Sequence, residues 1–302
     1  MSLTSHLANQ HSPVRQFFAH HLDADAIGAC VLALNIEATQ GRRCVPLVIS
    51  GTVPTLAGTA FDFGFRHFIE PFTPTQPPEL ALSGGWRARL AGWKKALPLL
   101  RDVLTTLADA DANGQAQRFV ALAAYAQFAR VLHAIVHPKA ATSDDFARGL
   151  YAHPPTTLDD LLARTPEATV QDVAALLAMA HTEWAWLRGQ PFVPNPRFPL
   201  SATLGGADAD WVLGGTLYEC KVSSQDRPLE RKHMLQLLGY LLLDTEDALG
   251  ITHVGFVLPR QRAVIQRDHA TFLQDLGATA SLPELRAHFA AVVGALPRAP
   301  QR

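Results

Sequence analysis

The stretch of sequence that decides the fold runs from residue 208 to residue 221 and reads Asp208-Ala209-Asp210-Trp211-Val212-Leu213-Gly214-Gly215-Thr216-Leu217-Tyr218-Glu219-Cys220-Lys221. Two apolar runs flank the glycine pair, and glycine readily adopts the positive φ angles that a two-residue hairpin turn requires. Directly opposed residues of such a hairpin share one face of the sheet. Counting outward from the turn therefore predicts five opposed pairs: Leu213 with Thr216, Val212 with Leu217, Trp211 with Tyr218, Asp210 with Glu219 and Asp208 with Lys221.

This register places the charged side chains on one face, with the Cβ atoms of Asp210 and Glu219 roughly 5 Å apart. Carboxylates this close repel each other unless a cation or a shared proton lies between them. Mg²⁺ suits such a pair because it binds through one or two carboxylates and keeps several waters. The ammonium of Lys221 can orient a water or offset charge on a phosphate oxygen. Three alternatives stay open: the charged side chains face solvent, Asp208 replaces Asp210 as the ligand, or Asp208 forms a salt bridge with Lys221. Asp210 is favoured over Asp208 because the apolar strand begins directly after it and it lies opposite Glu219.

The segment after the hairpin predicts a helix. From Arg227 to Leu243, apolar residues recur at helical spacing, so this helix is expected to pack on the sheet. Lys232, Gln236 and Tyr240 are spaced four apart and therefore lie along one stripe of it.

Two further strands follow the helix. Residues 251–258 predict a buried strand, residues 259–261 a turn, and residues 262–266 a shorter strand. The predicted order is strand, strand, helix, strand, strand.

These residues resemble the PD-(D/E)XK nuclease superfamily and, within it, the RecB-type exonuclease branch. Asp210, the triplet Glu219-Cys220-Lys221, and then Gln236 and Tyr240 match the D…(D/E)xK…QxxxY series of that branch in order. The resemblance implies an α/β (α+β) fold with a restriction-endonuclease-like core, in which helices flank a central mixed sheet.

The resemblance also implies hydrolysis of phosphodiester bonds in nucleic acid, with DNA favoured, by a metal-activated water. Asp210 and Glu219 would bind Mg²⁺ or Mn²⁺, helped by the backbone carbonyl of Cys220. Lys221 would position the attacking water, and Gln236 and Tyr240 would hold the nucleic-acid backbone or the lysine. The alternatives are a non-catalytic nucleic-acid-binding or scaffold module with this fold, and a metal-dependent hydrolase of another phosphate ester.

A second resemblance lies upstream, at Gly58-Thr59-Ala60-Phe61-Asp62. RecB-type nucleases often open their first core helix with Gly-x-x-x-His, whose histidine is a further metal ligand, and Asp62 would take that place. The alternative is an aspartate in the first turn of a helix, where it complements the helix dipole. If the match holds, an N-terminal helical segment (1–49) precedes a nuclease core that is split between about 50–83 and 190–302 by a helical insertion at about 84–189.

Candidate nucleic-acid contacts come from two basic clusters. Net charge is −1, so the chain does not coat nucleic acid through bulk charge and needs a local patch. One cluster follows the proposed site: Arg227, Arg231, Lys232 and His233. The other mixes aromatic and basic residues, among them Trp86, Arg87 and Lys94, which can stack bases and bind phosphates, although a solvated amphipathic helix is an alternative.

Composition indicates a globular protein. The chain has 302 residues, 48% of them hydrophobic, which suffices for a large core. Its three cysteines include no CxxC pair, so neither a disulfide framework nor a zinc ribbon is expected. No apolar run reaches the roughly 18 residues of a membrane span. We therefore expect a cytoplasmic protein with no membrane partner, and the resemblance implies nucleic acid, with DNA favoured, as its partner.

Overall fold

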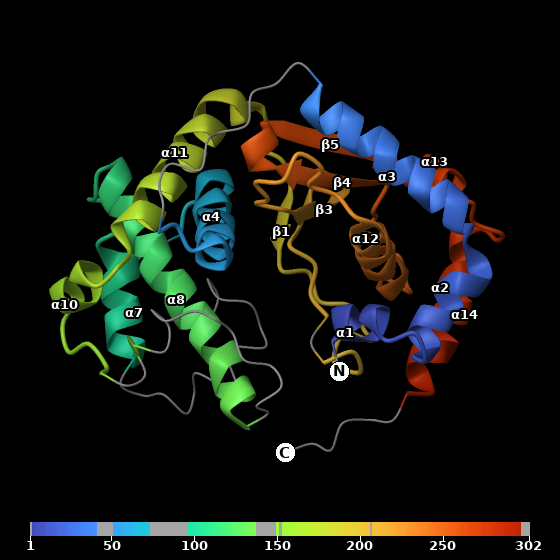
Figure 1. The fold of residues 1–302 in the computed structure, drawn as a ribbon, viewed down its shortest axis with the longest axis horizontal. Coiled ribbons are helices and arrows are strands. Elements are labelled where there is room, and N and C mark those ends of the chain that lie inside the picture. Colours follow the sequence, from blue (N-terminus) through green and yellow to red (C-terminus); the bar gives the residue numbers. More distant parts are fainter. Residues whose placement is uncertain are drawn as a thin grey trace. The chain divides into compact units, whose positions relative to one another are not determined.

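The computed structural model describes residues 2–40, 51–72, 96–136, 149–150, 153–205 and 207–296 (Figure 1). Within them the fold is mixed α/β, with eleven α-helices and one five-stranded mixed sheet, as the sequence predicted at this level. The chain divides into two compact units. The first comprises Met1–Cys44, Gln190–Lys221 and Gln225–Arg302, and the second comprises Val45–Gly189 and Val222–Ser224.

The first unit contains the sheet, whose strands lie in the order β1-β2-β3-β4-β5. Neighbouring strands are antiparallel except β3 and β4, which are parallel. The strands are β1 (Phe192–Pro194), β2 (Trp211–Leu213), β3 (Thr216–Cys220), β4 (His253–Leu258) and β5 (Ala263–Asp268). The predicted order of strand, strand, helix, strand, strand from residue 211 onward is confirmed.

The hairpin of β2 and β3 forms as the glycine pair predicts. Gly214 and Gly215 have φ angles of 58° and 77°, the left-handed values that a turn of this kind needs. The three observed pairs, Leu213 with Thr216, Val212 with Leu217 and Trp211 with Tyr218, are those predicted by counting from the turn.

Strand β1 was not predicted as a strand. Phe192 to Pro194 pair with Leu213 to Trp211. The strand is short and lies at the edge of the sheet, where a proline is tolerated because no further strand needs its missing N–H.

Helix α12 (Arg231–Leu243) links β3 to β4 and lies at the centre of the first unit. Its start is four residues later than predicted, because Glu230 forms a capping box with His233 and so ends the preceding extended segment. Every residue from His233 to Leu243 is buried. The helix contacts β3 and β4 as well as three other helices, so it is a core helix and not one that covers a single face of the sheet.

The remaining helices of the first unit come from both ends of the chain. They are α1 (Leu3–Ala8), α2 (Pro13–His21), α3 (Ala24–Thr39), α13 (His269–Asp275) and α14 (Leu282–Gly294). α1, α3 and α14 contact α12, and α3 also contacts β5. Asp23 caps α3 by accepting hydrogen bonds from the backbone N–H groups of Asp25 and Ala26, both at 2.8 Å.

In the described residues no single helix has the length and apolar character to cross a membrane. α2 and α3, bent by 87°, pass that test only when taken together.

The second unit is helical in its described parts. Its helices are α4 (Pro54–Ile69), α7 (Ala96–Thr105), α8 (Ala112–Val136), α10 (Leu158–Ala163) and α11 (Glu167–Glu183), followed by a 3-10 turn at Ala185–Leu187. α4, α8 and α11 contact one another. The segment 50–83, expected in the nuclease core, contributes α4 to this unit, whereas α1 to α3 belong to the unit that contains the sheet.

Candidate active site

Asp210 lies immediately before β2, and backbone pairing sets its position. Its carbonyl accepts a hydrogen bond from Asn195 N at 2.9 Å, next to the β1–β2 ladder. Its carboxylate Oδ2 accepts the backbone N–H of Cys220 at 2.7 Å. The carboxylate therefore bridges to the opposite strand at the open end of the hairpin.

Glu219 is the fourth residue of β3, and its side chain is buried and paired. Glu219 is 3% exposed. Its Oε1 lies 2.6 Å from Lys221 Nζ, and the side chain of Lys221 is 22% exposed. The carboxylate and the ammonium of the Glu219-Cys220-Lys221 triplet therefore form a largely buried ion pair.

Helix α12 completes this cluster with two side chains from one stripe. Gln236 Nε2 donates to Glu219 Oε1 at 2.9 Å and lies 3.1 Å from the Tyr240 hydroxyl. Gln236 Oε1 accepts from Lys221 Nζ at 3.4 Å. Gln236 and Tyr240 are 8% and 6% exposed. The structure thus brings together four of the five predicted catalytic residues in one hydrogen-bonded network, with Asp210 close enough to act on it electrostatically.

The charges of the cluster act on each other. Burial raises the pKa of Tyr240 well above its ordinary value, and the negative charges of Glu219, Asp210 and Asp208 raise it further. For Lys221, burial alone would lower the pKa, but the charges of Glu219 and Asp210 outweigh it, so the pKa is raised. Lys221 is therefore an ammonium at neutral pH and Tyr240 a neutral hydroxyl.

A hard cation would find oxygen donors here. Asp210 and Glu219 are carboxylates on neighbouring chain segments of the hairpin, and the donor type and number suit Mg²⁺, which needs few protein ligands and keeps its waters. No set of three or more His, Cys, Asp or Glu side chains able to hold a metal is found within the described ranges. The fit is thus one of donor chemistry, for a largely hydrated ion on two carboxylates.

The predicted basic contacts have different environments. Arg227 and Arg231 are exposed, and Lys232 is exposed and paired with Glu230 at 2.9 Å. His233 is buried, and its ring Nδ1 accepts a hydrogen bond from the backbone N–H of Glu230 at 3.0 Å. Trp86, Arg87 and Lys94 lie outside the described residues.

Asp62 belongs to the second unit and pairs within its own helix. It is not in the first turn, because α4 begins at Pro54 and not near Gly58 as expected. Arg66 lies one turn further along the helix, and both its Nε, at 3.0 Å, and its Nη2 donate to the Asp62 carboxylate. The dipole interpretation of Asp62 is therefore wrong, and its structural partner is Arg66, whose side chain is 4% exposed.

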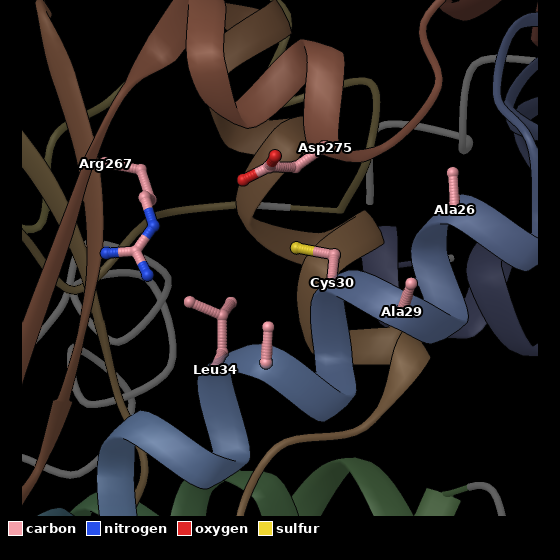
Figure 2. Close-up of a pocket in the computed structure, with 7 residues that line it drawn as sticks. Ala26, Ala29, Cys30, Leu34, Arg267 and Asp275 are labelled. Carbon is pink, nitrogen blue, oxygen red and sulfur yellow. The ribbon is translucent and has the colours of Figure 1, made fainter.

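A cavity of about 320 Å³ lies elsewhere in the first unit, between α3, β5 and α13 (Figure 2). Alanines and Leu34 of α3 line it together with Cys30, Arg267 and Asp275. Burial, with the nearby charge of Asp275, raises the pKa of the Cys30 thiol to about 11, so the thiol is not an activated nucleophile. None of the predicted site residues lines this cavity.

Two features of the site were not predicted from the sequence. One is the hydrogen bond from the Cys220 N–H to Asp210, since that residue was expected to contribute its carbonyl. The other is the side-chain cap of α12 by His233. The sequence gives little signal for this cap. Glu230 precedes His233 by three residues, but the familiar capping box has Glu or Gln, and not His, at the third helical position.

Comparisons of this chain with protein-family models, with curated proteins and with solved structures found no match. The candidate site is therefore defined by its own residues and their contacts.

Proposed function

We propose that this protein is a metal-dependent nuclease that hydrolyses phosphodiester bonds of nucleic acid, with DNA as the favoured substrate. The observation that carries the proposal is the network of Glu219, Lys221, Gln236 and Tyr240, beside which Asp210 bonds the chain of the Glu-x-Lys triplet. Removing a carboxylate and an ammonium from water has a large desolvation cost, which their mutual attraction often does not offset. A buried ion pair held by a glutamine from the following helix is therefore poorly explained by stability alone. It is the arrangement expected of a site that binds a cation and an anionic substrate together.

The fold around the network supports the same proposal. The hairpin places Asp210 and Glu219 at neighbouring positions, and α12 then crosses to a parallel strand, β4. We take the first unit as a restriction-endonuclease-like core on the basis of this order of elements. The sheet fixes the two carboxylates and Lys221, and the buried stripe of α12 fixes Gln236 and Tyr240.

Each residue has a chemical task that follows from its contacts. Asp210 and Glu219 would hold Mg²⁺ or Mn²⁺, which when bound lowers the pKa of a coordinated water and offsets negative charge on the phosphate. The ammonium of Lys221 orients the attacking water or binds a phosphate oxygen. Gln236 holds Glu219 and Lys221 in one relative orientation, because it donates to the first and accepts from the second. Tyr240 stays a neutral hydroxyl next to Gln236.

The test is cleavage of end-labelled single-stranded DNA, duplex DNA and RNA by the full chain, with Mg²⁺, with Mn²⁺ and with EDTA. We expect cleavage with either metal and none in EDTA. Asp210→Asn and Lys221→Met should each lose at least about a hundredfold in rate, the scale of losing one preorganised electrostatic group. Asp159→Asn, which removes an exposed carboxylate from the second unit, is the matched control and should cleave as the unmodified chain does.

The outcomes separate the alternatives. Binding of nucleic acid without cleavage under any metal condition would indicate a non-catalytic binding module. Hydrolysis of a small phosphate diester but of no nucleic acid would indicate another phosphoesterase. Cleavage by Lys221→Met at the rate of the unmodified chain would contradict the role assigned to Lys221.

A further inference from the structure

His233 is a buried polar side chain for which the proposed reaction has so far no use. It is the third residue of α12 and is 8% exposed. Its Nδ1 accepts the backbone N–H of Glu230 at 3.0 Å, while the Glu230 side chain accepts the backbone N–H of His233. The two residues therefore form a reciprocal cap at the start of the helix.

This cap fixes which ring nitrogen carries the hydrogen. A nitrogen that accepts a hydrogen bond has no hydrogen of its own, so the neutral ring must carry its hydrogen on Nε2. The ring is neutral, because burial, followed by the positive charges of Lys221 and Lys232, lowers its pKa to about 4. His233 is thus an uncharged donor through Nε2 at neutral pH.

The ring also lies on the stripe of α12 that faces the candidate site. His233 precedes Gln236 by three residues and Tyr240 by seven, a spacing that places all three on one side of a helix. Gln236, on the same stripe, accepts from Lys221 Nζ at 3.4 Å, and the positive charge of Lys221 adds to burial in lowering the pKa of the ring. Nε2 makes no hydrogen bond within the part of the chain that the structure describes.

We propose that His233 Nε2–H donates a hydrogen bond to a non-bridging phosphate oxygen of the nucleic acid beside Lys221. This inference rests on the proposed function. Phosphate oxygens only accept hydrogen bonds, so a bound backbone needs donors, and most contacts to nucleic acid are made to these oxygens. A neutral donor supplies such a bond next to the ammonium of Lys221 without adding a second positive charge that would repel it.

Three substitutions separate the donor from the cap. His233→Gln keeps both, since its carbonyl can accept the Glu230 N–H and its amide can donate. His233→Glu keeps the cap, because glutamate at the third position forms the usual capping box, but it has no donor. His233→Met has neither cap nor donor and adds no charge, so it distinguishes loss of the donor from repulsion by a new carboxylate.

The readouts are thermal unfolding, binding of a fluorescein-labelled DNA oligonucleotide in EDTA, and steady-state cleavage with Mg²⁺. We expect His233→Gln, which keeps both the donor and the cap, to stay closest to the unmodified chain in all three. We expect His233→Glu and His233→Met to bind the oligonucleotide about tenfold or more weakly, with KM raised by a similar factor. Only His233→Met should unfold at a lower temperature, through loss of the cap.

Two results would overturn the inference while leaving the proposed function standing. One is cleavage and binding by His233→Glu and His233→Met equal to those of the unmodified chain. The other is a loss of binding in His233→Met alone, in step with its lower unfolding temperature, which would reduce His233 to a helix cap. If the unmodified chain neither binds nor cleaves any nucleic acid, the proposed function fails and the inference fails with it.

Discussion

Replacing Lys221 by methionine should destabilise the metal-free protein, because it leaves the buried carboxylate of Glu219 without its partner. The two side chains are 22% and 4% exposed, and the pair is 2.6 Å apart. Removing one partner of a buried ion pair costs about 3–5 kcal/mol. Gln236 still donates to Glu219 at 2.9 Å in the variant, so we expect the lower end, about 3 kcal/mol. For a folding unit of about 150–250 residues this lowers Tm by roughly 6–12 °C.

The chain supplies a matched control for burial. Lys232 and Glu230 form an ion pair of the same residue types and sequence spacing at 2.9 Å, but their side chains are 63% and 52% exposed. Lys232→Met should therefore cost about 0–1 kcal/mol. The double variant Glu219→Gln, Lys221→Met removes both buried charges and should recover most of the stability lost in Lys221→Met.

The assay is thermal and urea unfolding in EDTA, followed by circular dichroism. An unfolding curve of Lys221→Met that coincides with that of Lys232→Met would refute the reasoning. So would a double variant that is less stable than Lys221→Met, because the buried charge would then not be the cause of the loss.

Two further predictions concern stability. Burial, and then the charge of His181, lowers the pKa of His67 from 6.5 to about 4. Between these two pH values the imidazole is therefore protonated in the unfolded chain and neutral in the folded one. The free energy of unfolding should then decrease by about 2 kcal/mol through His67 as pH falls through that interval, allowing for the partly exposed ring. His67→Gln should reduce the pH dependence in urea titrations by this amount, whereas the contribution of His233, whose pKa is also about 4, stays. The prediction would be contradicted if the free energy of unfolding of His67→Gln had the same slope against pH as that of the unmodified chain. In Gly255→Ala the new Cβ would clash with the carbonyl oxygen of Ile265, so we expect a loss of at least about 2 kcal/mol. Gly294→Ala, with no atom within 4 Å of the new Cβ, should be neutral or gain up to about 1 kcal/mol. Equal urea midpoints for these two variants would show that Gly255 has more room than its surroundings indicate.

The sheet around the candidate site was predictable wherever a local signal was strong. The glycine pair at 214 and 215 requires positive φ, and that alone fixes the register of β2 and β3. The spacing of Gln236 and Tyr240 places both on one stripe of α12, and the structure bonds them to each other. Periodicity and turn chemistry are local properties of a sequence, which is why they are visible in it.

Features that depend on contacts between distant segments could not be predicted from the sequence. The pairing of β1 with β2 joins residues on either side of a long loop, and nothing in the three residues from Phe192 to Pro194 marks them as a strand. The start of α12 was misplaced because the apolar pattern extends back to Leu229, whereas the cap begins at Glu230. Asp62 was interpreted from its distance to Gly58, but the boundary of α4 is set by Pro54.

The short strand β1 has a consequence for how the sheet behaves toward other molecules. A sheet edge normally offers a row of unpaired N–H and C=O groups, on which a strand of another chain can add and begin an aggregate. Here the outermost strand has three residues and ends in Pro194, which has no N–H to donate, and the next proline follows two positions later. An incoming strand would find almost no ladder to extend, so self-association through this edge is discouraged by the backbone itself.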